Sequence, residues 1–205
     1  MSEIYDSYKC YHASKVANLD ALKPDFSRYG EELVYFSTVR ENTLVYLGNA
    51  IERYCLDNNI DYHDTYRKWT TYGFTDAGML CLDEYYPNAI EETYKGEHGY
   101  VYCVEKVANA KMLDGIRNVV VTNEIQKICS CEYIEDAHVA LLKAVEENKI
   151  MLKRYEEHSE EKIENIKKIV INEYANFTSD KVYQKFLSAK FTFLPTSESE
   201  ECNDE

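Results

Sequence analysis

Two short segments of the chain carry residue types that could bind a flat ligand with a sugar attached. The first is Tyr11-His12-Ala13-Ser14, in which a histidine is followed by a small residue and a hydroxyl. At a strand end such a run presents an imidazole beside accessible backbone, and both can hydrogen-bond a ribose or an amide. The alternative is that His12 is an ordinary core or edge histidine whose hydrogen bonds are satisfied within the fold.

The second segment is Val34-Tyr35-Phe36-Ser37-Thr38, an apolar run that ends in two hydroxyl residues. Thr43 and Tyr46 follow eight and eleven residues after Tyr35, where the pattern predicts the start of a helix. If that helix turns back over the strand, the rings of Tyr35 and Tyr46 face each other across a flat slot.

These residues resemble the ADP-ribosyltransferase fold, in the histidine-tyrosine-glutamate branch that includes the poly-ADP-ribose polymerases and diphtheria toxin. The first motif of that branch is His-Gly followed by Ser or Thr, and here Ala13 stands in place of the glycine. The second motif is Tyr-Phe-Ala, then Ser at plus eight and Tyr at plus eleven. Tyr35, Thr43 and Tyr46 match this spacing, with threonine in place of serine.

The third motif of the branch is a glutamate near the start of a later strand, often within Asn-Glu. Asn123-Glu124 follows the strand-like run at 118–121 and stands third in the expected order.

The chain from residue 8 to residue 193 also resembles a group of uncharacterised bacterial proteins.

The resemblance implies an NAD-dependent ADP-ribosyltransferase or NAD glycohydrolase, with Glu124, His12 and Tyr35 as catalytic residues. Glu124 would bind the ribose 2′-hydroxyl, stabilise the oxocarbenium-like cation and position the nucleophile. His12 would hydrogen-bond the adenosine ribose, while Tyr35 and Tyr46 would sandwich the nicotinamide. The residues expected to bind NAD are Ala13, Ser14, Ser37, Thr43 and Tyr46, with the Ala13 backbone and the Thr43 hydroxyl on the carboxamide.

Other interpretations stay open. Glu84, Glu91 and Glu132 also fall near strand ends or turns and compete with Glu124 for the catalytic role. Ala13 favours a catalytically inactive module that keeps the fold and binds a nucleotide or a protein, because a glycine lets backbone approach a ligand closely. A third interpretation is an enzyme that removes an RNA 2′-phosphate with NAD, but this activity would need clustered arginines, which the sequence lacks. A fourth is a structural protein in which the motifs are coincidental.

Composition narrows the partners. The chain of 205 residues has 37 acidic and 23 basic residues, a net charge of −14, and such a surface repels phosphate backbones. We therefore expect no nucleic-acid partner, whereas a basic protein acceptor fits this charge. No apolar run is long enough to span a membrane and the first residues carry no export signal, which predicts a cytoplasmic protein without a membrane partner.

The cysteines give no sign of a metal site. Seven are scattered along the chain, as is typical of reduced thiols in the cytosol. The one close pair, Cys129-Ser130-Cys131, has no second pair to complete a zinc tetrahedron. We therefore expect no metal.

The order of predicted elements indicates an α+β fold. Periodicity predicts strands at 9–13, 33–37, 79–82, 100–105, 118–121 and 124–130, a helical turn at 87–92, and helices at 42–58, 135–148, 160–176 and 181–190. The resemblance adds a mixed sheet folded as a split β-sandwich, followed by a C-terminal helical layer. We expect a sheet region at 1–133, helices at 134–194 packed on the same domain, and an acidic disordered tail at 195–205.

Overall fold

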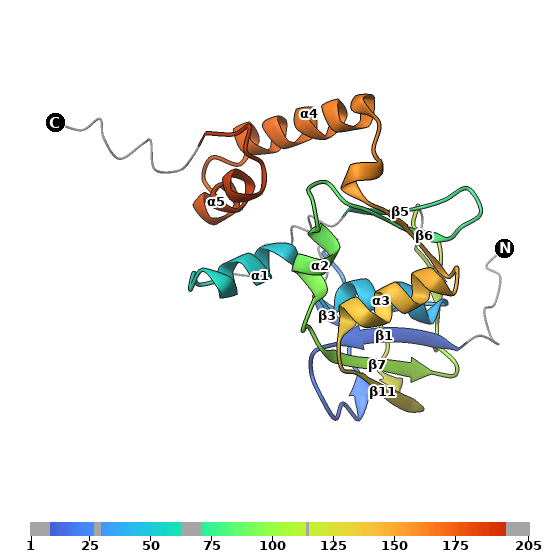
Figure 1. The fold of residues 1–205 in the computed structure, drawn as a ribbon. Coiled ribbons are helices and arrows are strands. Elements are labelled where there is room, and N and C mark those ends of the chain that lie inside the picture. Colours follow the sequence, from blue (N-terminus) through green and yellow to red (C-terminus); the bar gives the residue numbers. More distant parts are fainter. Residues whose placement is uncertain (1–8, 27–29, 63–70, 114, 196–205) are drawn as a thin grey trace. The chain divides into compact units, whose positions relative to one another are not determined.

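The computed structural model describes residues 9–26, 30–62, 71–113 and 115–195 (Figure 1). The chain forms two compact units, and each is assembled from segments that are distant in the sequence. Unit 1 consists of residues 1–48, 72–81 and 94–151, and unit 2 consists of residues 49–71, 82–93 and 152–205. Most of the tail expected at 195–205 lies outside the described residues.

An antiparallel sheet forms the centre of the described part of unit 1. Its strands follow the order β11-β7-β1-β4-β9-β8, and β3 pairs with β4 outside this path. Every pair with a described register is antiparallel, whereas the resemblance implies a mixed sheet. The strands are β1 (Cys10–Ser14), β3 (Asp25–Phe26), β4 (Glu32–Ser37), β7 (Gly99–Val104), β8 (Lys111–Met112), β9 (Val119–Thr122) and β11 (Ser130–Ile134).

Shorter elements surround this sheet. The two-residue strands β2 (Ala21–Leu22) and β10 (Gln126–Lys127) pair with each other. Unit 1 also contains the 3₁₀ helix η1 (Arg40–Tyr46) and the helix α3 (Ala137–Glu146). A three-stranded sheet has the order β12-β6-β5, and the chain passes between the units within its strands β12 (Ile150–Lys153), β6 (Leu80–Asp83) and β5 (Thr71–Phe74).

One face of the large sheet carries a buried hydrophobic cluster of unit 1. Side chains alternate between the two faces of a strand, so every second residue of β1, β4, β7 and β9 contributes to this core. Each fully buried aliphatic or aromatic side chain stabilises the fold by roughly 1.5–3 kcal/mol. The buried cluster consists of Cys10, Leu22, Val34, Phe36, Tyr102, Val104, Val107 and Val120.

Unit 2 is built mainly from helices. They are α1 (Ala50–Asp57), α4 (Glu160–Asn176), α5 (Lys181–Lys190), the short 3₁₀ helix η2 (Tyr155–Glu157) and α2 (Ala89–Tyr94), whose last residue belongs to unit 1. Ser159 and Asp180 cap α4 and α5 by accepting hydrogen bonds from the amides of Lys162 and Tyr183. Buried residues of α1, α4 and α5, such as Ile51, Val170 and Phe186, form a second core.

Two sequence predictions are wrong in detail. The helix predicted at 42–58 is two elements, η1 and α1, because Asn49 has extended backbone and its side chain caps α1 through the amides of Ile51 and Glu52. The strand predicted at 124–130 is reduced to β10, and the chain pairs with β7 only from Ser130 onward. None of the helices within the described residues is long and apolar enough to cross a bilayer.

Candidate functional site

The large sheet brings the three predicted motifs onto neighbouring strands. His12 lies on β1, Tyr35 lies on the adjacent β4, and Glu124 follows β9, which pairs with β4. Tyr35 is opposite Val121, and Tyr11 is opposite Ser37. Because adjacent strands lie about 4.8 Å apart, segments more than a hundred residues apart in the sequence meet within one small area.

The strand register divides the predicted residues between the two faces of the sheet. Paired residues point to the same side, and successive residues point to opposite sides. The pairing of Tyr11 with Ser37 therefore puts His12 on the side opposite to Ser37. One face, called the site face here, carries Ala13, Tyr35 and Ser37, and the other, called the core face, carries His12, Ser14 and Phe36.

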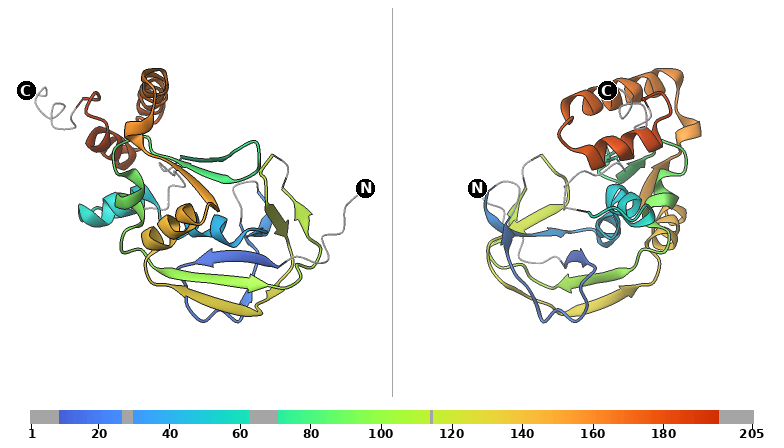
Figure 2. Two further views of the ribbon diagram at one scale, coloured as in Figure 1. Left: turned by 45° about the vertical axis from the view of Figure 1, so that its right-hand side comes forward. Right: turned by 90° about the vertical axis from the view of Figure 1, so that its left-hand side faces the viewer.

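The helix η1 covers the site face. Ala13 pairs with Val101, and Val101 pairs with Glu132, so the Glu132 side chain is on the site face. Arg40 of η1 binds that carboxylate. In Figures 1 and 2, η1 and α3 lie on the same side of β1 and β7. Thr43 and Tyr46, as residues of η1, therefore lie on the same side of the sheet as Ala13, Tyr35 and Ser37.

His12 is held in a defined orientation on the core face. Its Nδ1 lies 2.9 Å from the carbonyl oxygen of Tyr35, and a carbonyl can only accept, so Nδ1 carries the proton. Burial lowers the pKa of His12 more than this hydrogen bond raises it, which favours the neutral ring. The Nε2 atom is then an acceptor, and the ring packs edge-on against Phe36.

Tyr35 carries a buried polar atom without a partner. Among the residues that the structure describes, its hydroxyl makes no hydrogen bond although the oxygen is shielded from solvent. An unsatisfied buried hydroxyl costs about 1–3 kcal/mol. A bound polar group that reaches this oxygen would recover that cost.

The η1 residues have partners of their own. The Thr43 side chain is buried and donates a hydrogen bond to the carbonyl oxygen of Arg40 at 2.7 Å, which leaves its oxygen able to accept. Tyr46 is 46% exposed, and its ring packs edge-on against Tyr72 with centroids 6.3 Å apart. No local sequence pattern predicts the contact with Tyr72, which is distant in the chain.

Two predicted serines shape local turns. Ser14 Oγ accepts a hydrogen bond from the amide of Val16, and Ser37 Oγ accepts one from the amide of Val39, each at 3.1 Å. These bonds end β1 and β4 where the chain turns away from the sheet. Both hydroxyls keep their proton available for a ligand.

Glu124 lies in a bend after β9 and is exposed to solvent. The Asn109 side chain donates a hydrogen bond to the Glu124 carboxylate. The backbone amide of Glu124 donates to Thr122 Oγ1 at 3.2 Å. Thr122 pairs with Val34 and so points to the core face, where it donates to the carbonyl oxygen of Ala108. Glu124 is therefore anchored to the turn at 108–109.

The competing glutamates have different surroundings. Glu84, in unit 2, is fully buried and accepts hydrogen bonds from the amides of Ile90 and Tyr155 and from Arg154 Nη1 at 3.0, 3.3 and 3.3 Å. This carboxylate joins separate segments of unit 2, which is a structural role. Glu132 instead lies on the site face, exposed and paired with Arg40.

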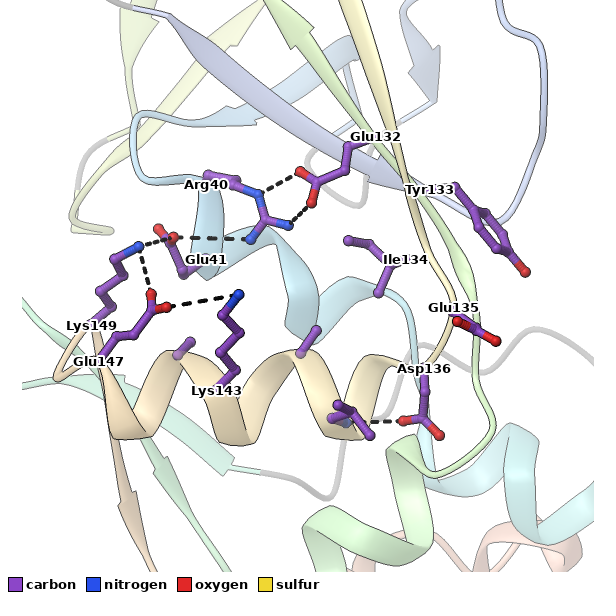
Figure 3. A pocket seen from close by; sticks show the side chains of 13 residues that line it. Arg40, Glu41, Glu132, Tyr133, Ile134, Glu135, Asp136, Lys143, Glu147 and Lys149 are labelled. Atoms are coloured by element: carbon purple, nitrogen blue, oxygen red, sulfur yellow. Dashed lines mark hydrogen bonds and ion pairs between the residues drawn. The ribbon is translucent and has the colours of Figure 1, made fainter.

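A pocket of about 850 Å³ opens beside Glu132 and Arg40, between η1, β11 and α3 (Figure 3). Arg40 donates from Nε and Nη2 to the two oxygens of Glu132, at 2.7 and 2.6 Å, and this bond raises the pKa of Arg40. Lys149 bridges Glu41 and Glu147, each at 2.9 Å. No local sequence pattern predicts this pocket, because the two partners of its central ion pair, Arg40 and Glu132, are far apart in the chain.

Comparisons with protein-family models, with curated proteins and with solved structures find no match. Within the described residues, no group of three or more histidine, cysteine, aspartate or glutamate side chains is arranged to hold a metal ion.

Proposed function

We propose that the chain is an ADP-ribosyltransferase or NAD glycohydrolase with the split β-sandwich of that class. The observation that carries the proposal is that β1, β4 and β9, which bear the His12, Tyr35 and Glu124 motifs, are consecutive strands of one sheet. A second support is that Ala13, Tyr35 and Ser37 lie on the site face and that η1, which carries Thr43 and Tyr46, covers this face.

The site face would hold the nicotinamide. The Tyr35 and Tyr46 rings offer stacking worth about 0.5–1.5 kcal/mol per aromatic pair beyond burial, which orients the ring more than it drives the reaction. The Thr43 oxygen and the backbone at Ala13 would bind the carboxamide. The unpartnered hydroxyl of Tyr35 would gain its missing hydrogen bond from the same ligand.

Glu124 would supply the chemistry. When the N-glycosidic bond breaks, nicotinamide leaves with the bonding electron pair and positive charge develops on the ribose C1′, which a carboxylate stabilises. The nucleophile, water or a side chain of an acceptor protein, then bonds to C1′ and gives its proton to the Glu124 carboxylate. The neutral His12 would accept a hydrogen bond from a ribose hydroxyl at Nε2, since Nδ1 is occupied.

The test is release of free nicotinamide from NAD by the full chain, measured by chromatography. We expect release by the wild type and a loss of at least about 100-fold in Glu124→Gln, in line with the usual contribution of a positioned acid–base group. Glu105→Gln, which removes another exposed carboxylate, is the matched control and should keep full activity. Equal activity in the two variants would remove Glu124 from the mechanism.

A second candidate is a module that binds NAD or a related nucleotide without turnover. The observation that favours it is the division of the motifs between two faces: His12 points to the core face and Tyr35 to the site face. Calorimetry distinguishes the two candidates, because the module binds NAD and releases no nicotinamide. If the chain neither binds nor cleaves NAD, both candidates fail.

A further inference from the structure

We propose that the pocket between η1, β11 and α3 is a docking site for an extended basic peptide of a partner protein, which adds a strand to the edge of the sheet at β11. This inference does not depend on NAD binding or cleavage. It rests on three features of unit 1: the charge of the pocket, the open edge of β11 and the apolar side chains around them.

The pocket carries an excess of acidic side chains. Its lining has the basic side chains Arg40, Lys143 and Lys149 and the acidic side chains Glu41, Glu132, Glu135, Asp136 and Glu147. Ion pairs to Lys149 lower the pKa of Glu147, and although burial opposes it, amide hydrogen bonds from Val139 and Gly96 lower the pKa of Asp136. Both are therefore ionised at neutral pH, and the net charge of −2 attracts cations.

The charged groups differ in their exposure. The Arg40 and Glu41 side chains, 26% and 14% exposed, are more buried than Glu132 and Glu147, which are 54% and 41% exposed and are called the rim carboxylates. The rim carboxylates keep one side toward solvent, so a cation from a partner can pair with them while their internal partners stay in place. A guanidinium or an ammonium group would bind the remaining lone pairs of these oxygens, because each carboxylate oxygen can accept more than one hydrogen bond.

The edge of β11 supplies the second feature. β11 pairs with β7 on one side, and within the described residues no strand pairs with its other side. Four of its five residues, Ser130 to Tyr133, are exposed. An edge strand presents unpaired N–H and C=O groups, which an extended peptide can bind as an additional strand.

The edge and the pocket belong to one surface, because Glu132, Tyr133 and Ile134 are both residues of β11 and part of the pocket lining. A peptide paired with β11 would direct every second side chain to the site face, where the pocket opens. Val139, 62% exposed, offers an apolar contact beside it, whereas Tyr133, 54% exposed, points to the core face, where the remaining side chains of the peptide would lie (Figure 3). The expected sequence therefore alternates arginine or lysine with β-branched or aromatic residues.

The test uses a fluorescein-labelled octapeptide of alternating arginine and valine, titrated with the full chain and followed by anisotropy. We expect saturable binding that weakens as salt is raised, no binding of the glutamate–valine peptide, and slower hydrogen exchange at residues 130–134 in the complex. Glu147→Lys should weaken binding by about tenfold or more, because it brings like charges together at the rim.

Glu146→Lys is the matched control, since Glu146 is the exposed neighbour of Glu147 on α3 and does not line the pocket. It makes the same change in net charge and should bind as the wild type does. Equal weakening by both variants would mean that the peptide responds only to the overall charge of −14, which overturns the proposal. The added strand is refuted if hydrogen exchange at residues 130–134 does not change on binding. It is also refuted if an arginine–valine peptide N-methylated at its valines binds as tightly as the unmethylated peptide.

Discussion

Gly99 lies where β7 begins, and it has no room for a side chain. A Cβ atom at this position would lie 2.7 Å from Leu47 Cδ2 and 2.9 Å from the carbonyl oxygen of Ser14, against ordinary contacts of 3.4–4 Å. Leu47 is fully buried and cannot turn away, and Ser14 is fixed because it pairs with Tyr100. The Gly99→Ala variant must therefore displace η1 from β1 or strain the sheet.

We expect this variant to lose about 1–3 kcal/mol of unfolding free energy, the usual cost of overpacking. For a chain of this size that corresponds to a fall in Tm of roughly 3–10 °C in thermal unfolding followed by circular dichroism. Gly73→Ala is the control, because a Cβ there meets nothing within 4 Å, and it should melt at or slightly above the wild-type temperature. If Gly99→Ala melts within about 1 °C of Gly73→Ala, then Leu47 and Ser14 do not exclude a Cβ atom at residue 99, and the reasoning is refuted.

Two further predictions concern a histidine and a buried carboxylate. Because burial lowers the pKa of His12, the unfolded chain binds more protons than the folded chain, so the stability of the fold should fall as the pH drops below about 6.5 toward the folded-state pKa. In thermal unfolding between pH 5 and 8, the melting temperature of His12→Asn should depend less on pH than that of the wild type, and equal dependence would contradict this prediction. Glu84→Gln should lower the free energy of unfolding in urea by about 2–4 kcal/mol, because it leaves buried donors without their carboxylate, whereas the exposed Glu156→Gln should lower it by less than about 0.5 kcal/mol. A similar small loss in both variants would show that the Glu84 contacts contribute little to stability.

Much of the helical structure could be predicted because its signals are local. The helices at 160–176 and 181–190 were predicted with the bounds that the structure gives, because each carries an apolar stripe, and the structure shows that Ser159 and Asp180 cap them. The prediction of one helix at 42–58 failed at Asn49, whose side chain caps a new helix where the apolar spacing continues without interruption.

The candidate site was harder to predict because it depends on strand register. The sequence placed His12 and Tyr35 on strands and ordered the motifs, but whether two side chains share a face changes with a shift of one residue. The register that pairs Tyr11 with Ser37 puts the side chains of His12 and Tyr35 on opposite faces of the sheet. The ion pair of Arg40 with Glu132 likewise depends on β11 lying two strands away from β1, and no local pattern encodes that order.

The position of β1 within the sheet bears on how the protein is made. β1 lies between β4, which follows it closely in the sequence, and β7, which is synthesised roughly ninety residues later. At about 5–20 residues per second, a ribosome needs roughly 5–20 s to supply that second partner. During this interval one edge of β1, next to the residues of the candidate site, is available for wrong pairing. We therefore expect the yield of folded protein to depend on chaperones that bind short β-strands, and more so when translation between residues 40 and 100 is slowed.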